Sequence, residues 1–188
     1  MKYVIWDWNG TLFNDVKICI ASMNRLLERN QLPLIKDDAE YRSKCSFPVK
    51  NYYKDLGFDF EKVPFEQLAK EFMEIYQSDS LQCTLTEEVE NVISVLKKKG
   101  YKQIILSASK RRNLIQQMEQ FGISSYFEEI LVLSDIYAKS KVEIAREWIE
   151  DKTIENITVI GDTYHDYDVA KEINASCLLY SKGHQSIT

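Results

Sequence analysis

Short apolar runs alternate with helical stretches over residues 86–188, and this alternation limits the possible folds more than any other feature. The apolar runs are QIIL (103–106), EILVL (129–133), ITVI (157–160) and SCLLY (176–180). The helical stretches between and before them span residues 87–99, 110–121, 141–150 and 166–173. Strands that are separated by single helices form right-handed βαβ units in one parallel sheet. We therefore predict an α/β fold with helices on both faces of a parallel sheet.

A further strand is predicted at the N-terminus, where residues 2–6 (KYVIW) are rich in β-branched and aromatic side chains. Gly10 interrupts this run, so Asp7 stands at the carboxyl end of the strand. Ser107 and Asp162 follow two other predicted strands in the same way. Ligands of open parallel sheets bind at the carboxyl ends of the strands. We expect these three polar residues to converge on one crevice.

The segment between the first strand and the alternating region shows no convincing strand. Apolar residues recur at helical spacing from Val16 to Leu27, which predicts an amphipathic helix over residues 15–29. Two more helix-compatible stretches follow, near residues 37–55 and 64–79, and they are interrupted by Pro48, Gly57 and Pro64. The sequence thus predicts an all-helical insertion at residues 14–83.

Composition excludes some classes of function. The chain is 45% hydrophobic and 28% charged, as expected of a soluble globular protein. Its net charge of −5 argues against nucleic acid as a partner. We find no apolar run of membrane-spanning length and no signal-peptide pattern, so we expect a cytoplasmic protein without membrane contact. The four cysteines form no CxxC pair and are expected to be reduced thiols; a monomer or a homodimer is expected.

The sequence DWNGT at residues 7–11, directly after a strand, resembles the first motif of the haloacid dehalogenase superfamily. Ser107, Lys141 and the acidic loop at residues 161–166 are similar in order and context to the second, third and fourth motifs. The resemblance covers nearly the whole chain, and it points to the phosphoglycolate-phosphatase-like branch. In that branch a helical cap is inserted after the first motif.

This resemblance implies an architecture and an activity. It implies a Rossmann-like three-layer core at residues 1–13 and 84–188, with a small all-helical cap domain at residues 14–83. The implied activity is that of a Mg²⁺-dependent phosphatase that hydrolyses a small phosphorylated metabolite, a phosphoglycolate-like phosphomonoester. An alternative is a catalytically weakened protein that binds a phosphate ligand or has a regulatory role. Haloalkanoate dehalogenation, which normally proceeds without Mg²⁺, is a further possibility within the superfamily.

The resemblance also implies roles for individual residues. Asp7 would attack phosphorus and form an aspartyl-phosphate, provided that a cation offsets the charge of the phosphate. Hard oxygen ligands suit Mg²⁺, and the implied ligands are the side chains of Asp7, Asp162 and Asp166 and the backbone carbonyl of Asn9. The implied phosphate contacts come from Thr11, Ser107, Ala108 and Lys141. Lys139 is an alternative to Lys141 as the phosphate lysine.

Asn9 departs from the motif, because related phosphatases carry a second Asp there. That Asp protonates the leaving oxygen and then activates water, and an amide does neither. General acid–base help is typically worth about 10² to 10⁴ in rate. Three outcomes stay open: substrates with good leaving groups, proton transfer by His165 or by the substrate, or a long-lived phospho-enzyme.

Three weaker expectations concern the surroundings of the site. Arg42 and Lys50 in the cap are candidates for binding a second anionic group of the substrate. Ser109 is predicted to cap the helix that follows Ser107. His165 is expected to have a structural role.

Overall fold

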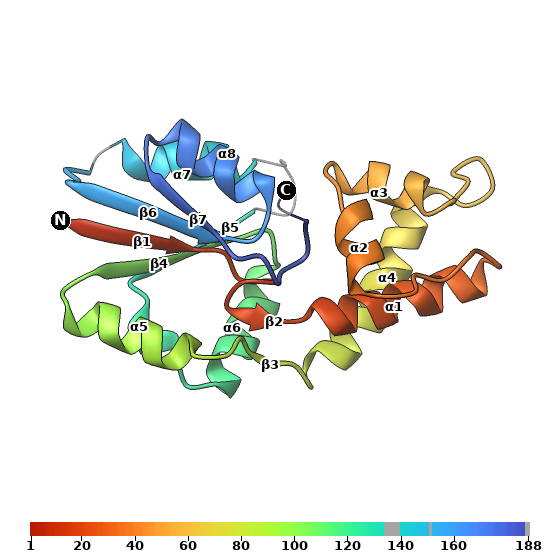
Figure 1. Ribbon diagram of the computed structural model, residues 1–188, viewed down its shortest axis with the longest axis horizontal. Helices are drawn as coiled ribbons and strands as arrows, with labels where there is room; N and C mark the ends of the chain where they lie inside the picture. The colour runs from red at the N-terminus through yellow and green to blue at the C-terminus, as the bar shows by residue number, and fades with distance from the viewer. Residues whose placement is uncertain (134–139, 151, 187–188) are drawn as a thin grey trace.

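The computed structural model describes residues 1–133, 140–150 and 152–186. Its main sheet has five parallel strands in the order β5-β4-β1-β6-β7 (Figure 1). The strands span Lys2–Trp6 (β1), Lys102–Ser107 (β4), Glu129–Val132 (β5), Asn156–Gly161 (β6) and Ser176–Leu179 (β7). This arrangement confirms the predicted α/β fold with a parallel sheet.

Helices cover both faces of the sheet and make three layers (Figure 1). One face is covered by α5 (Val89–Lys98) and α6 (Arg111–Gln120), and the other by α7 (Lys141–Ile149) and α8 (Tyr164–Glu172). Successive residues of a strand point to opposite faces. Val4 and Trp6 accordingly pack under α5 and α6, whereas Tyr3 and Ile5 pack under α7 and α8. Residues 3–6 of the first strand are buried apolar and aromatic side chains, because the strand is central and covered on both sides.

The strand order brings three strand ends together. The chain enters at β1, continues to β4 and β5 on one side, and then crosses to β6 and β7 on the other side. Trp6, near the end of β1, pairs with Ile105 on β4 and with Ile160 on β6. The residues that follow β1, β4 and β6 therefore meet at one edge, at the point where the strand order reverses and ligands bind.

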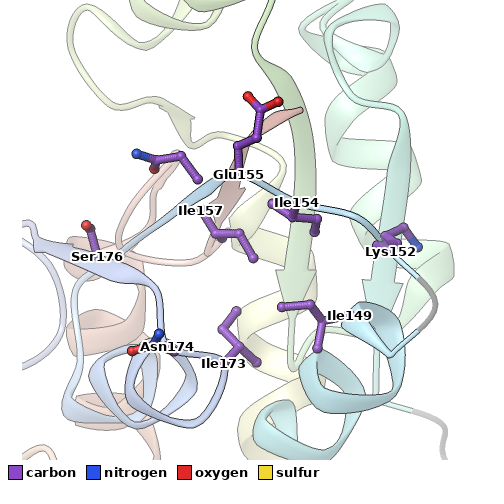
Figure 2. Close-up of a pocket in the computed structure, with 9 residues that line it drawn as sticks. Ile149, Lys152, Ile154, Glu155, Ile157, Ile173, Asn174 and Ser176 are labelled. Atoms are coloured by element: carbon purple, nitrogen blue, oxygen red, sulfur yellow. The ribbon is translucent and has the colours of Figure 1, made fainter.

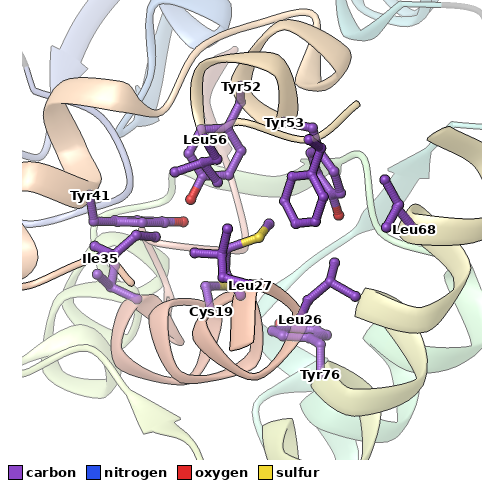
Figure 3. Close-up of a cluster of buried hydrophobic side chains, with 13 residues drawn as sticks. Cys19, Leu26, Leu27, Ile35, Tyr41, Tyr52, Tyr53, Leu56, Leu68 and Tyr76 are labelled. Carbon is purple, nitrogen blue, oxygen red and sulfur yellow. The ribbon is translucent and has the colours of Figure 1, made fainter. Parts of the chain in front are cut away.

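The segment predicted to be helical contains four helices. They are α1 (Val16–Arg29), α2 (Asp38–Lys44), α3 (Val49–Asp55) and α4 (Phe65–Ser80). The stretch predicted near residues 37–55 is divided in two, because Pro48 occupies the N-cap of α3 and cannot continue α2. These four helices share a hydrophobic cluster in which tyrosines surround Leu26 and Leu27 (Figure 3). This separate cluster supports our proposal that residues 14–83 form a cap domain on a core of residues 1–13 and 84–188.

A short antiparallel pair of strands joins the two parts, and the sequence pattern did not predict it. Strand β2 (Phe13–Asn14) pairs with β3 (Thr84–Leu85) where the chain leaves for α1 and returns from α4 (Figure 1). Strands of two residues are too short to show a period of two. A short 3₁₀ helix, η1 (Ser124–Tyr126), precedes β5.

The helices and the cysteines bear on two further properties of the chain. Among the described residues, every helix is too short or too polar to span a lipid bilayer. All four cysteines are free thiols, as predicted.

Candidate active site

Polar side chains gather at the carboxyl ends of β1, β4 and β6. Asp7 follows β1, Ser107 ends β4 and Asp162 follows β6. The carboxylates of Asp7, Asp162 and Asp166 are buried, and one oxygen from each lies within 4.8 Å of the others. The structure therefore brings together residues that are as much as 159 positions apart, counted from Asp7 to Asp166.

Lys141 supplies the positive charge of this cluster. It is the first residue of α7, and its ammonium lies 2.6 Å from Oδ1 of Asp7 and 3.0 Å from Oδ1 of Asp166. Burial alone would lower the pKa of Lys141, but the two carboxylates outweigh burial and raise it. The side chain is therefore an ammonium at neutral pH. The alternative phosphate lysine, Lys139, lies outside the described residues.

Asp166 fixes both a helix end and the lysine. Its Oδ2 accepts hydrogen bonds from the N–H of Asp162 at 3.2 Å, and from the N–H and hydroxyl of Thr163 at 3.1 and 2.7 Å. Thr163 is the N-cap of α8, so Asp166 completes a capping box there. A Cβ atom on Gly161 would overlap the Asp166 side chain, and only glycine allows this close approach. Burial would raise the pKa of Asp166, but Lys141 and Thr163 hold it below its usual value.

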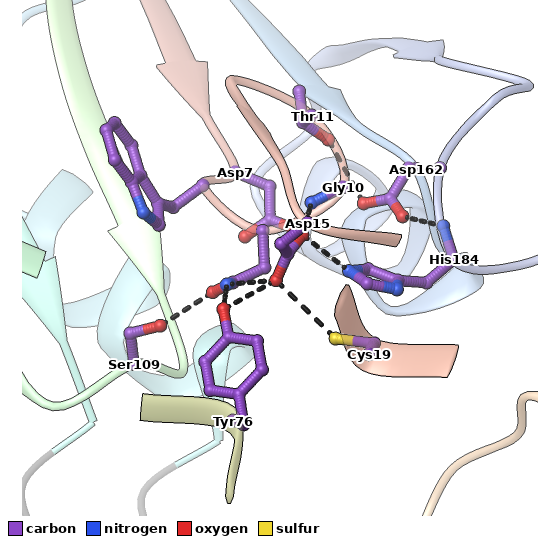
Figure 4. Close-up of polar contacts among 12 residues, drawn as sticks. Asp7, Gly10, Thr11, Asp15, Cys19, Tyr76, Ser109, Asp162 and His184 are labelled. Atoms are coloured by element: carbon purple, nitrogen blue, oxygen red, sulfur yellow. Dashed lines mark hydrogen bonds and ion pairs between the residues drawn. The ribbon is translucent and has the colours of Figure 1, made fainter. Parts of the chain in front are cut away.

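Asp162 is held by two donors from distant parts of the chain. Its Oδ1 accepts from the Thr11 hydroxyl at 3.0 Å, and its Oδ2 accepts from the backbone N–H of His184 at 2.5 Å (Figure 4). The resemblance implied a phosphate contact from Thr11, whereas in the structure its hydroxyl positions Asp162. Gly10 lies between these groups with φ of +72°, and a Cβ atom there would overlap Asp162 and the His184 ring. Glycine is therefore required at this turn.

The charges of the cluster suit a divalent cation. Among the described residues, Lys141 pairs with two of the three carboxylates, those of Asp7 and Asp166. Burial raises the pKa of Asp7; Lys141 opposes this shift, and the nearby carboxylates of Asp166 and Asp162 add to it. Burial also raises the pKa of Asp162. A hard cation would stabilise the ionised forms of these neighbouring carboxylates, and a donor set made of oxygen atoms alone fits Mg²⁺.

The Asn9 side chain is fully engaged in hydrogen bonds. Its Nδ2 donates to Oδ2 of Asp15 at 2.7 Å and to the hydroxyl of Tyr76 at 2.9 Å, and its Oδ1 accepts from the hydroxyl of Ser109 at 2.6 Å. Both amide hydrogens are thus used. The predicted helix cap at Ser109 was wrong: Lys110 occupies the N-cap of α6 without a side-chain hydrogen bond. The Ser109 hydroxyl holds Asn9 instead.

Asp15 is the centre of a second buried network, which the sequence analysis missed. Its Oδ1 accepts from the Gly10 N–H at 2.9 Å and lies 3.0 Å from Nε2 of His184, and its Oδ2 accepts from the Tyr76 hydroxyl at 2.6 Å. Burial would raise the pKa of Asp15, but His184 and the hydrogen bonds hold it below its usual value. Burial would lower the pKa of His184, but Asp15 outweighs this and raises it to about 9. The two side chains form a buried ion pair.

This second network has the residue types of a metal site, because Cys19 joins Asp15 and His184. The Cys19 thiol donates to Oδ2 of Asp15 at 3.6 Å. The three groups already satisfy one another, so the network needs no ion to balance its charge. A local signal for His184 is lacking, since it lies in a loop after β7 and reaches Asp15 across 169 positions.

A cavity of about 330 Å³ lies between these residues and the cap helices α1–α4. Asp7, Asn9, Ala108, Lys141 and His184 line one side of it. Apolar and aromatic side chains line the rest: Met23, Tyr41, Phe47, Val49, Tyr52, Tyr53, Ala69, Phe72 and Met73. The predicted phosphate-binding residue Ala108 is therefore at the cavity wall. Ser107 is buried behind it, and its Oγ accepts from the Ser109 N–H at 3.0 Å.

The two predicted cap cations do not reach this cavity. Arg42 donates from Nε to the carbonyl oxygen of Gly183 at 2.8 Å, and so ties the cap to the loop after β7. The Lys50 ammonium lies over the rings of Phe60 and Phe65, at 5.5 and 5.8 Å from their centres. Long cationic side chains have several partners within reach. Here the Gly183 carbonyl binds Arg42, and two aromatic rings bind Lys50. The structure thus corrects the expectation that they bind a second anion of the substrate.

His165 stacks on Phe47 at the edge of the cavity, with ring centres 4.8 Å apart and planes 3° apart. This packing agrees with the structural role expected for His165. A separate pocket of about 340 Å³ lies at the opposite end of the sheet, where β6 and β7 begin (Figure 2). Ile154, Ile157 and Ile173 form its apolar part. None of the carboxylates of the candidate active site lines it.

The chain is similar in sequence and in fold to several known proteins. The sequence profile of a family described as haloacid dehalogenase-like hydrolase matches residues 4–180. Pyrophosphatase PpaX from Bacillus pumilus (strain SAFR-032) is 24% identical over 173 residues, which cover 87% of this chain and 75% of that protein. The structure of Mycobacterium tuberculosis Protein Tyrosine Kinase A superposes with a TM-score of 0.82 at 19% identity, over 97% of this chain and 85% of the other. The structure of a predicted phosphoglycolate phosphatase from Haemophilus somnus 129PT superposes with a TM-score of 0.76 at 17% identity, over 100% of this chain and 88% of the other.

Proposed function

Since the chain belongs to the haloacid dehalogenase-like hydrolase family and is a phosphatase-type hydrolase, we propose that it is a Mg²⁺-dependent phosphomonoesterase with Asp7 as its nucleophile. One observation carries this proposal. The strand-end carboxylate of Asp7 is paired with the buried ammonium of Lys141 at 2.6 Å, between two further buried carboxylates. Such a set can hold a phosphate next to a nucleophile and balance its charge.

The proposed reaction has two displacements at phosphorus. A carboxylate oxygen of Asp7 forms a bond to phosphorus, and the bond from phosphorus to the leaving oxygen breaks with its electron pair. Water then attacks the aspartyl-phosphate, phosphate leaves, and the Asp7 carboxylate is restored. Lys141 offsets the charge on the equatorial oxygens as a point charge. We assign the neighbouring phosphate contacts to Ser107 and to the Ala108 N–H.

The residues that would hold the cation are Asp7, Asp162 and Asp166, with the backbone carbonyl of Asn9 as a further ligand. A bound Mg²⁺ would supply positive charge to the phosphate oxygens and to the carboxylates around them. Thr11 and the His184 backbone orient Asp162 for this task.

The test is phosphate release by the full chain with Mg²⁺ and with EDTA, comparing wild type with Asp7→Asn. We expect Mg²⁺-dependent release that falls by several orders of magnitude in Asp7→Asn. Asp55→Asn changes an exposed carboxylate at the end of α3 and serves as the control. Circular dichroism checks that both variants fold. Activity that persists in Asp7→Asn would exclude Asp7 as the nucleophile.

A second candidate function is a phosphate-ligand binding or regulatory protein with little turnover. The observation that favours it is Asn9, whose amide is engaged in three hydrogen bonds and carries no transferable proton. Inorganic phosphate binding by calorimetry, without release from any ester, would support this alternative.

A further inference from the structure

The cavity beside Asp7 has the size and chemistry of an aromatic binding site. Its volume is about 330 Å³, whereas an apolar cavity of about 150 Å³ suffices to bind benzene. Phe47, Tyr52, Phe72 and Met73 are among its walls, and Asp7 also lines it. An aromatic ring attached to a phosphate on Asp7 would therefore meet aromatic and thioether groups, which favour such contacts.

The described residues that line this cavity offer a second anionic group no lysine or arginine without a carboxylate partner, and Lys110 lines only the adjoining pocket of about 550 Å³. Among the described residues that line the cavity, Lys141 is paired with two carboxylates and His184 is paired with Asp15. His165 is stacked on Phe47. Arg42 and Lys50 are held elsewhere. A carboxylate or a second phosphate on the substrate would lose its hydration without gaining a cation, which is unfavourable.

Asn9 restricts the leaving group independently of the cavity. Position 9 carries no carboxylic acid to protonate the leaving oxygen, because Asn9 is an amide whose two hydrogens are donated to Asp15 and Tyr76. The missing proton transfer costs about 10² to 10⁴ in rate for a basic leaving group. A phenolate is a much weaker base than an alkoxide, since phenols such as the tyrosine side chain have a pKa of about 10. An aromatic ester of phosphate therefore suits both the cavity and Asn9.

We propose that the substrate is a monophosphate ester of a phenol with no second anionic group, and that its ring occupies the cavity lined by Phe47, Tyr52, Phe72 and Met73. This inference rests on the proposed function. Asp7 forms a bond to phosphorus while the bond from phosphorus to the phenolic oxygen breaks. The phenolate takes a proton from solvent, and water then releases phosphate from Asp7.

Four substrates separate the parts of this proposal. Phenyl phosphate has the ring and the good leaving group, cyclohexyl phosphate has an apolar ring with a poor leaving group, and phosphoglycolate has a second anion and a poor leaving group. Acetyl phosphate has a good leaving group without a ring, and reports on Asp7 alone. With Mg²⁺, we expect kcat/KM for phenyl phosphate to exceed that for cyclohexyl phosphate and phosphoglycolate by at least about 10².

The outcomes distinguish this inference from the proposed function. If no substrate, including acetyl phosphate, gives turnover that depends on Asp7, the proposed function fails. If acetyl phosphate is hydrolysed but kcat/KM for phosphoglycolate equals or exceeds that for phenyl phosphate, the inference fails and the proposed function stands. A preference for phenyl phosphate supports both.

A cavity-filling variant tests where the ring binds. Ala69 lies on α4 at the cavity wall, and Ala69→Phe reduces the space. We expect the ratio of kcat/KM for phenyl phosphate to that for acetyl phosphate to fall at least tenfold. Ala39→Phe, at an exposed position on α2, is the matched control and should leave this ratio unchanged. An unchanged ratio in Ala69→Phe would show that the ring binds elsewhere.

Discussion

Replacing Asn9 by Asp puts two carboxylates in direct contact. The amide nitrogen of Asn9 lies 2.7 Å from Oδ2 of Asp15 and 2.9 Å from the Tyr76 hydroxyl. An ionised Asp donates neither bond and faces Asp15 with like charge. A hydrogen bond to a charged group contributes about 1.5–3 kcal/mol. We therefore expect Asn9→Asp to lower the free energy of unfolding by about 2–3 kcal/mol at pH 7.

Urea denaturation of the full chain measures this loss. With a slope of about 1–3 kcal/mol per molar urea, the midpoint should fall by roughly 1 M. Asn51→Asp makes the same change at an exposed position on α3 and is the control. A midpoint that falls equally in both variants, or in neither, would refute the assigned network.

The exchanged pair provides the stricter test. In the double variant Asn9→Asp/Asp15→Asn, an amide again faces a carboxylate at this position, with the two roles reversed. The free-energy loss of the double variant should therefore be smaller than the sum of the two single losses by about 1–3 kcal/mol. Losses that add to within about 0.5 kcal/mol would mean that Asn9 and Asp15 do not interact.

Four further predictions concern Asn9, Lys141, Gly10 and Asp162. Asn9→Asp should raise kcat with cyclohexyl phosphate by about 10-fold or more and change kcat with phenyl phosphate little, because only the basic leaving group needs an acid; no gain in steady-state assays would contradict this account of Asn9. Lys141→Met leaves two buried carboxylates unpaired, so in EDTA we expect the free energy of unfolding to fall by about 3 kcal/mol; a loss below about 1 kcal/mol in urea titrations would argue against it. Gly10→Ala should destabilise more than Gly100→Ala, because both positions have positive φ but only at Gly10 would a Cβ overlap other side chains; equal melting temperatures would disprove the close approach. Mg²⁺ should raise the melting temperature of the wild type and not that of Asp162→Asn, and an equal rise in both would place the cation elsewhere.

Much of the fold could be predicted because the strands are buried on both faces. Runs such as QIIL and ITVI are apolar without alternation, and single helices between them leave few topologies. The division of α2 from α3 follows an interruption that Pro48 already marks in the sequence. The pair β2–β3 could not be predicted in the same way, because strands of two residues are too short to show a period.

Topology and the resemblance each predicted part of the site. Asp7, Ser107 and Asp162 stand at strand ends, which parallel strands bring together. Lys141 and Asp166 were predicted from the resemblance alone, and both lie in the same cluster. His184 arrives from a loop, and only the folded chain shows that it meets Asp15. Arg42 also contacts that loop, through the Gly183 carbonyl, because a long side chain binds whichever acceptor the fold presents. The cytoplasmic location and the monomeric or homodimeric state stay predictions.

Because β2 pairs with β3, the helical segment between them can be replaced by a different inserted sequence. Phe13 pairs with Leu85 and Asn14 with Thr84, so the chain leaves the sheet and returns to it at one point. Antiparallel neighbours of this kind can be joined by a turn of about two residues. Seen from the sheet, residues 15–83 are one long loop, and a different insert can replace them without altering the strand order. Substrate preference can therefore diverge by insertion and deletion at a single place, while Asp7, Lys141 and Asp162 lie outside the exchanged segment. A new insert must replace the contacts that Asp15 and Tyr76 make with Asn9.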